Sequence, residues 1–155
     1  MKKSLKYNLK YRDFLKYKEN YFSKISKKCG LFFAFGKEQF NQALEENNLA
    51  IDDIVVIGCG GYMPKNKITL HKHLMDKYDA LNESYFTSLH NNKNYKEILK
   101  SAVRYELGNY EYGYTRDNYT LENVYYKTKF NRYEKNNKIF FEAVKEYLDW
   151  SDEIN

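Results

Sequence analysis

The chain has 155 residues, a net charge of +5 and an apolar share of 43%. A domain of this length hides about 70% of its unfolded surface and can bury a real core, whereas no apolar run approaches the roughly 18 residues that a membrane span needs. Its two cysteines lack a CxxC spacing and are too few for a disulfide scaffold, so we expect a soluble, cytoplasmic protein.

Positive charge is concentrated at the start of the chain. Residues 1–30 hold ten Lys and Arg side chains against Asp13 and Glu19, a net charge of +8, which leaves −3 on the remaining residues. A basic arm on a mildly acidic body favours a polyanion or an acidic protein surface as the partner. The same run also fits the solvated face of a Lys-rich helix, so both interpretations stay open.

Residues 8–29 are predicted to form a basic helix. Apolar side chains recur in this segment at spacings of three and four, with most lysines on the opposite side. Gly30 follows Lys27 and Lys28 and stands where a C-cap glycine belongs. The helix is therefore expected to end where the central stretch of the chain begins.

The central stretch, Leu31–Lys65, contains two apolar runs that bracket an amphipathic segment. Leu31–Phe35 predicts a strand buried on both faces, residues 37–46 predict a helix, and Ile54–Ile57 predicts a second strand. This order favours a crossover unit with parallel strands, and a hairpin with a helical insertion is the alternative. We expect the rest of the chain to pack on this stretch.

Beyond the central stretch the pattern is mainly helical. Thr69 is the expected N-cap of a helix over residues 70–90. A further helix over Tyr95–Asn109 carries Glu106 on its inner face, where the carboxylate needs a partner if it is buried. Weaker patterns predict a short third strand over Tyr112–Thr115 and a helical turn over Thr120–Tyr126, and an amphipathic pattern predicts a last helix over Asn137–Trp150.

The glycine run Gly58–Gly61 follows a predicted strand and precedes a predicted helix, a setting in which backbone N–H groups can hold a phosphate. However, Met63 stands where the dinucleotide fingerprint has its last glycine, and no GKS or GKT is present for a P-loop. Glycines after a strand also serve close packing. Nucleotide binding at this run is an alternative to a purely structural role.

Cys59 lies in the same glycine run, with His71 and His73 downstream. A thiol nucleophile is therefore a second chemical alternative, although a small buried Cys at a strand end is the ordinary case. On a helix the two histidines diverge by about 200°, so they cannot share an ion. We expect no metal and no cofactor.

Basic residues mixed with aromatic residues form the remaining pattern, in the N-terminal helix and in the region between Tyr110 and Tyr119. Rings stack on unpaired bases while cations follow phosphates, a combination used on single-stranded nucleic acid. The same tyrosines also fit a core with a solvated rim, and no RNP, KH or helix-turn-helix signature is present. The predicted contact residues are Lys10, Arg12, Lys16, Lys24, Lys27, Lys28, Tyr112, Tyr114, Arg116, Tyr119, Lys129 and Arg132.

Three phrases of the sequence resemble a family of small proteins of unknown function found in phages, plasmids and bacteria. They are FFAFGKEQF (Phe32–Phe40), IGCGGYMPK (Ile57–Lys65) and YELGNYEYGYT (Tyr105–Thr115), and the family shows FAFS-x-EQF, GGGGY and ELANHEY in the same order. The resemblance covers Leu31–Val124. It departs at Gly36, Cys59, Gly108 and Tyr110.

The sequence predicts an α+β fold that is predominantly helical, with a small two- to three-stranded sheet packed against several α-helices. We expect a single domain over residues 1–155, made of the basic N-terminal helix (8–29), the family core (31–124) and a C-terminal helical extension (128–155). The resemblance implies a protein of a mobile genetic element in the host bacterial cytoplasm, and it implies no established activity.

The leading functional hypothesis is a non-enzymatic inhibitor or modulator of a host nucleic-acid-handling defence system. Accessory proteins of mobile elements often bind host machinery, for instance as anti-CRISPR proteins, so the resemblance suggests a CRISPR-type effector protein, its guide RNA or their complex as the partner. One alternative is a small enzyme acting on a nucleotide or through Cys59 at the glycine run. Another is a structural accessory domain that forms homo-oligomers.

Overall fold

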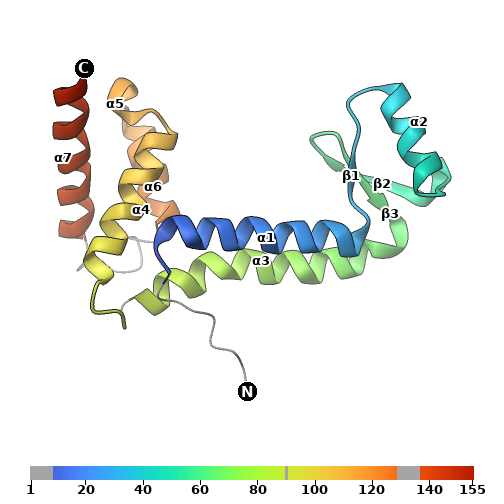
Figure 1. Ribbon diagram of the computed structural model, residues 1–155, viewed down its shortest axis with the longest axis horizontal. Helices are drawn as coiled ribbons and strands as arrows, with labels where there is room; N and C mark the ends of the chain where they lie inside the picture. The colour runs from blue at the N-terminus through green and yellow to red at the C-terminus, as the bar shows by residue number, and fades with distance from the viewer. Residues whose placement is uncertain (1–8, 90, 129–136) are drawn as a thin grey trace. The chain divides into compact units, whose positions relative to one another are not determined.

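The computed structural model describes residues 9–89, 91–128 and 137–155, and the chain forms two compact units. We call Lys16–Leu81 the sheet unit, and Met1–Leu15 together with Asn82–Asn155 the helical unit. Helices α1 (Tyr11–Cys29) and α3 (Ile68–Leu89) each contribute residues to both units. Figure 1 shows the order of the elements along the chain.

The predicted fold class is confirmed: the described residues form a predominantly helical α+β structure with one small sheet. The sheet unit contains the strands β1 (Phe32–Phe33), β2 (Ile54–Gly58) and β3 (Gly61–Pro64), in the order β1-β3-β2. Helix α2 (Lys37–Glu46) lies between β1 and β2 in the chain and has the predicted bounds. None of the described helices is both long enough and apolar enough to cross a membrane.

Strands β1 and β2, which α2 connects, run parallel as predicted, but they are not neighbours in the sheet. Strands β1 and β2 do not pair with each other, because each pairs antiparallel with β3, which lies between them. The glycine run explains the difference: Gly58, Cys59 and Gly60 all have left-handed φ values of 93°, 50° and 74°. Such a turn reverses the chain at once, so β3 lies beside β2 and its other edge pairs with β1.

The expectation that Leu31–Phe35 is buried on both faces is also wrong. Of the side chains in this run only Ala34 is buried, and Phe35 is 80% exposed. One face of the sheet packs Met63 against Ile25 and Cys29 of α1. This small core contrasts with the predicted role of the central stretch as the packing centre of the whole chain.

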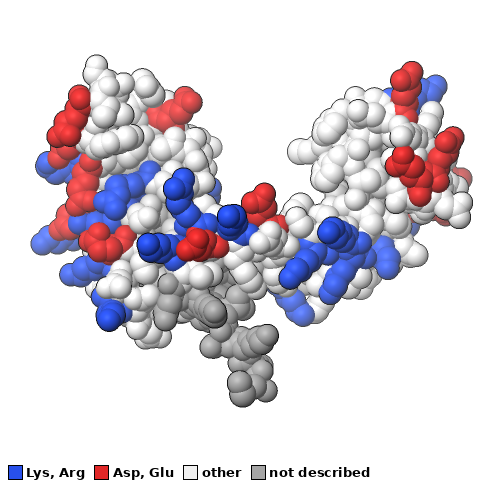
Figure 2. Space-filling view, in the orientation of Figure 1, with Lys and Arg blue, Asp and Glu red and all other residues white. Residues whose placement is uncertain are grey.

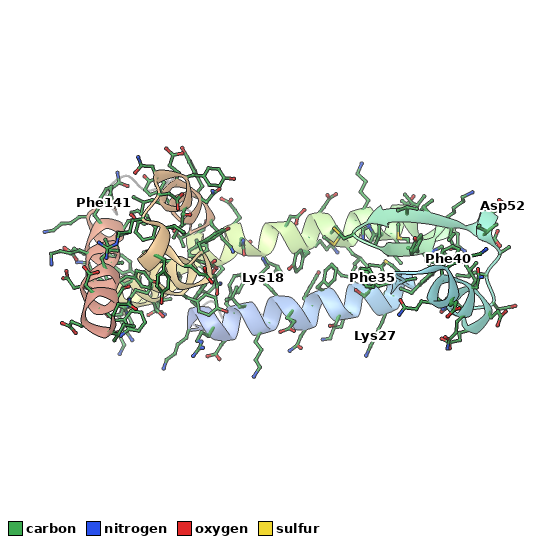
Figure 3. The ribbon with its side chains drawn as sticks, turned by 90° about the horizontal axis from the view of Figure 1, so that it is seen from above. Lys18, Lys27, Phe35, Phe40, Asp52 and Phe141 are labelled. Carbon is green, nitrogen blue, oxygen red and sulfur yellow. The ribbon has the colours of Figure 1, made fainter. Side chains whose placement is uncertain are left out.

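The second face of the sheet is covered by α2. The ring of Tyr62 on β3 stacks on Phe32 at a centroid distance of 5.5 Å and contacts Phe40 of α2 at 4.9 Å. In Figure 3, Phe40 lies in this layer between α2 and the strands. The amphipathic pattern of residues 37–46 therefore serves local packing on the sheet.

Helix α1 ends at the predicted glycine. Gly30 has a φ of 64°, its N–H donates to Lys27 O at 3.3 Å, and the Leu31 N–H donates to Ser26 O at 2.9 Å. These two bonds form a Schellman motif, which satisfies the last carbonyl groups of a helix and favours glycine at the left-handed position. The end of α1 could be predicted from the local sequence because this cap depends on a single residue, Gly30.

Helix α3 begins earlier than predicted. Two short 3-10 helices, η1 (Ile51–Asp53) and η2 (Lys65–Lys67), flank the β2–β3 hairpin, and α3 continues directly from η2 at Ile68. Thr69 therefore lies inside the first turn, and its predicted N-cap role is wrong.

The helical unit is built around α4 (Tyr95–Asn109), which has the predicted bounds. It packs against α5 (Tyr112–Thr115), α6 (Asn118–Lys127) and α7 (Asn137–Ile154). The largest fully buried side chains of the helical unit include Tyr85, Leu89, Val103, Leu107, Val124 and Phe140. Most of the buried apolar side chains that the structure describes belong to this unit.

The predicted third strand over Tyr112–Thr115 is instead the short helix α5. Glu111 and Arg116, at its two ends, have left-handed φ values of 52° and 46°. These two reversals isolate a single turn, which packs on α7 and buries Tyr112. An extended strand at this position would have needed an edge to pair with, and the sheet belongs to the other unit.

Glu106 on α4 has the partners that its burial requires. The side chain is 1% exposed, Tyr11 donates its hydroxyl hydrogen to Oε1, and Lys127 Nζ lies 2.7 Å from Oε2. Burial, followed by the hydrogen bond to Glu106, raises the pKa of Tyr11, so its hydroxyl remains a donor. The carboxylate therefore joins α1, α4 and α6 in the core of the helical unit.

Helix α6 begins with a charged cap that makes its stability depend on pH. Hydrogen bonds from Thr115 and from the Thr120 backbone N–H lower the pKa of Asp117 from 3.8 to about 2. A lowered pKa means that the cap contributes fully above pH 3.8 and that its contribution is lost as the pH falls through about 2.

We expect Asp117→Ala to be less stable than the parent at neutral pH, with a difference that shrinks as the pH falls from about 4 to about 2. Thermal unfolding of both proteins over this pH range measures it. Asp117→Asn is the matched control, because asparagine caps without titrating. A difference that stays constant down to pH 2 would contradict the prediction.

Candidate nucleic-acid interface

Five lysines belong to two segments of the sheet unit that meet where α1 ends and η2 begins. The fold brings these two segments into contact, since a Cβ added at Gly30 would lie 3.4 Å from Pro64 Cδ. Burial raises the pKa of the Cys29 thiol, whereas Lys67 and Lys28 act in the opposite direction from the two sides. We call Lys24, Lys27, Lys28, Lys65 and Lys67 the lysine cluster.

No acidic residue lies in the segments that carry the lysine cluster. Residues 20–36 and 54–75 contain six lysines and no Asp or Glu, whereas residues 37–53 contain five acidic side chains and Lys37 alone. Figure 2 shows the lysines over the end of α1 and the acidic side chains over α2. The sheet unit is therefore strongly bipolar in charge.

The lysine cluster is solvent-accessible and uncompensated. Four of its side chains are exposed, and Lys67 is partly exposed. The lysine cluster takes no part in the ion pairs of the described residues that are formed by Lys100, Arg104, Arg116, Lys127, Lys138 and Lys145 of the helical unit. In Figure 3, Lys27 extends outward from α1, while Asp52 lies at the far tip of the sheet unit. The positive charges are thus available to an external anion.

The structure places the predicted contact residues in three groups. Lys24, Lys27 and Lys28 belong to the lysine cluster, and Lys16 is exposed on the α1 part of the sheet unit. Lys10 and Arg12 belong to the helical unit, where both line surface hollows. Lys129 and Arg132 lie outside the described residues.

The tyrosine-rich region presents fewer accessible groups than the sequence indicates. Tyr112 is 6% exposed and cannot offer its ring to a base, and Arg116 is ion-paired with Asp152 of α7. Tyr114 and Tyr119 remain available, at 78% and 76% exposure. The region therefore presents two accessible rings without the uncompensated cation that the sequence suggested.

Sequence reasoning missed Lys65 and Lys67. They follow Pro64 and stand far from the N-terminal helix in the chain, so nothing in a local pattern connects them with Lys27. The absence of acidic residues over 54–75 was the available signal, because a long acid-free stretch in a chain with 21 acidic residues is a charge pattern in itself.

The glycine run does not have the setting of a phosphate-binding loop. It connects β2 to β3 as a hairpin turn, not a strand to a helix, so no helix N-terminus follows it. Cys59 is exposed at this turn. In the part of the chain that the structure describes, no three His, Cys, Asp or Glu side chains are grouped to hold a metal ion.

Large apolar side chains are exposed beside the hairpin of the sheet unit. Phe33, Phe35 and Val56 are all more than half exposed, and Phe35 lies close enough to the turn that a Cβ at Gly60 would clash with its ring at 2.7 Å. The acid-free lysine cluster and this apolar rim belong to the same unit. Together they offer a patch of positive charge and an exposed apolar surface.

The fold and its charged surface define a predominantly helical α+β protein with a small antiparallel sheet and a bipolar sheet unit. The chain belongs to a family of unknown function, DUF7659, whose model matches residues 14–147. This match spans both units and includes the three phrases that resemble such a family. Neither the comparison with curated proteins nor that with solved structures found a match.

Proposed function

We propose that this protein is a non-enzymatic nucleic-acid-binding modulator whose sheet unit holds a phosphate backbone on the lysine cluster. The observation that supports this most directly is that two contacting segments of the sheet unit carry five lysines and no acidic residue. Each phosphate that a lysine neutralises releases condensed counterions, which drives binding to a polyanion. Scattered surface lysines alternating with carboxylates would not create such a field.

We further propose that the nucleic acid is held by a host protein, so that the target is a complex. The exposed Phe33, Phe35 and Val56 are apolar and do not suit a phosphate backbone, but they suit a protein surface beside it. A CRISPR-type effector with its guide RNA would present both a phosphate backbone and a protein surface beside it. The resemblance to proteins of phages and plasmids supports the same setting, an inhibitor that acts in the host cytoplasm.

The test is a salt series of binding to an unstructured single-stranded RNA, measured by fluorescence anisotropy. If five lysines neutralise phosphates of a single strand, we expect the logarithm of the binding constant K to fall linearly with the logarithm of the salt concentration. The expected slope is about −3 to −4. A neutral peptide nucleic acid of the same base sequence is the control and is expected not to bind. Absence of RNA binding at low salt, or binding without salt dependence, would overturn the proposal.

A further inference from the structure

A second surface of the chain, entirely within the helical unit, has the features of a small-molecule site. It is a hollow of about 670 Å³ with walls from α1, α4 and α7, within the roughly 300–1,000 Å³ of typical ligand pockets. The lysine cluster contributes nothing to it. The lining residues are Arg12, Arg104, Tyr105, Gly108, Asn109, Glu146, Tyr147 and Trp150.

Aromatic rings in fixed positions form part of the wall. Trp150 is 53% exposed and its ring contacts that of Tyr147 at a centroid distance of 5.7 Å. The ring of Tyr105 makes a T-shaped contact with the ring of Tyr11, also at a centroid distance of 5.7 Å. Trp150 and Tyr105 both line the hollow, so a planar ligand ring can lie against an aromatic wall.

The hollow also has a net positive charge. Glu146 is its one carboxylate, and it pairs with Arg104 at 2.8 Å and with Lys100 at 2.7 Å. The hydrogen bond from Lys100 is the main cause that lowers the pKa of Glu146, which stays ionised and neutralised. Arg12 has no carboxylate partner among the described residues, and its guanidinium carbon lies 5.9 Å from the centre of the Tyr105 ring.

Two further residues match the shape and polarity of a base. Asn109 offers a carbonyl acceptor and an amide donor side by side, the pair that reads a base edge. Gly108 leaves the floor open, because a Cβ added there meets nothing within 4 Å. A planar ligand ring therefore finds an aromatic side chain to stack on, and Asn109 can hydrogen-bond to its edge.

We propose that this hollow is a binding site for a single nucleotide. The base lies against Trp150, its edge hydrogen-bonds to Asn109, and its phosphate pairs with Arg12. This site goes beyond the phosphate-backbone surface of the sheet unit, because it lies in the other unit and uses different residues. A purely apolar ligand would leave the Arg12 charge unmatched, and an inorganic anion would not use the rings.

The experiment uses the intrinsic fluorescence of Trp150, the only tryptophan in the chain. AMP is titrated into the full-length protein with excitation at the red edge of the tryptophan band, so that the 17 tyrosines contribute little. We expect saturable quenching by AMP and at least tenfold weaker binding of adenosine, which lacks the phosphate. Free N-acetyltryptophanamide corrects for absorption by the nucleotide.

Two variants test the named contacts. Arg12→Ala is expected to weaken AMP binding at least tenfold, and Gly108→Leu to abolish it by filling the open floor without a clash. Lys93→Ala removes an exposed cation outside the hollow and is the matched control, with unchanged binding expected. Leucine is a good helix former, so we expect Gly108→Leu to fold. Its melting temperature, compared with that of the parent, shows whether the fold is kept. If Gly108→Leu does not fold, the result with Arg12→Ala alone tests the site.

The proposal is overturned if millimolar AMP leaves Trp150 fluorescence unchanged, if adenosine binds as well as AMP, or if Arg12→Ala and Lys93→Ala behave alike. These outcomes are independent of RNA binding by the lysine cluster, because the readout is a mononucleotide at the other unit. Saturable AMP binding without RNA binding would support this site and refute the proposed function.

Discussion

Replacing Glu106 by alanine is expected to lower the free energy of unfolding by about 3–4 kcal/mol, a large share of the total stability of a domain. Glu106 is buried, accepts the Tyr11 hydroxyl hydrogen and pairs with Lys127 at 2.7 Å. The substitution leaves a cavity and a buried hydroxyl without its acceptor, and both costs add. Lys127 is 42% exposed and can turn to water, so its loss contributes less.

Urea unfolding monitored by Trp150 fluorescence measures this effect, since Trp150 belongs to the helical unit. Tyr11→Phe, which removes only the donor, is expected to cost about 2 kcal/mol in the parent and about 1 kcal/mol or less in a Glu106→Gln background. Glu97→Ala, an exposed carboxylate on the same helix, is the control, with a change within about 0.5 kcal/mol. A loss below about 1 kcal/mol for Glu106→Ala would show that the network contributes little to stability.

Reversing three charges of the lysine cluster is expected to have the largest effect on binding. In Lys24→Glu/Lys27→Glu/Lys28→Glu each change removes an attraction to phosphate and adds a repulsion of about 1 kcal/mol in water at contact distance. After salt screening we expect at least about a 100-fold loss of affinity for single-stranded RNA near 0.1 M salt. The slope of log K against log salt is expected to become shallower by about two.

The matched control carries the same change in net charge elsewhere. Lys93, Lys96 and Lys138 are exposed lysines of the helical unit, and their triple change to glutamate leaves the lysine cluster intact. We expect less than about a threefold effect, from the general field alone. Fluorescence anisotropy with the same RNA compares the two proteins. Equal losses in both would mean that net charge, and not the cluster, determines binding.

Several features of the fold were predictable from local sequence signals. The bounds of α2 and α4 follow from the spacing of apolar side chains, and the end of α1 follows from Gly30, whose φ of 64° favours glycine. The sequence also indicated that Glu106 would need partners if buried. It could not identify Tyr11, because the two residues are 95 positions apart.

The candidate interface was predictable only in part. Lys24, Lys27 and Lys28 are neighbours on one helix, so their clustering is visible in the sequence. Lys65 and Lys67 join them only because Pro64 packs beside Gly30. In the opposite direction, Tyr112 and Arg116 look accessible in the sequence, whereas contacts with α7 bury the first and neutralise the second.

The sequence by itself determined the longer helices, the turns at the glycines and the uneven charge, because these depend on residues close together in the chain. The tertiary structure decided strand pairing and burial. The left-handed turn at Gly58–Gly60 brings β3 back onto β2, and the amphipathic helices 95–109 and 137–154 pack into a separate core. Phe33 and Phe35 are consequently exposed although their run is as apolar as a buried strand. Burial depends on which surfaces find partners across the chain, and no local pattern of residues contains that information.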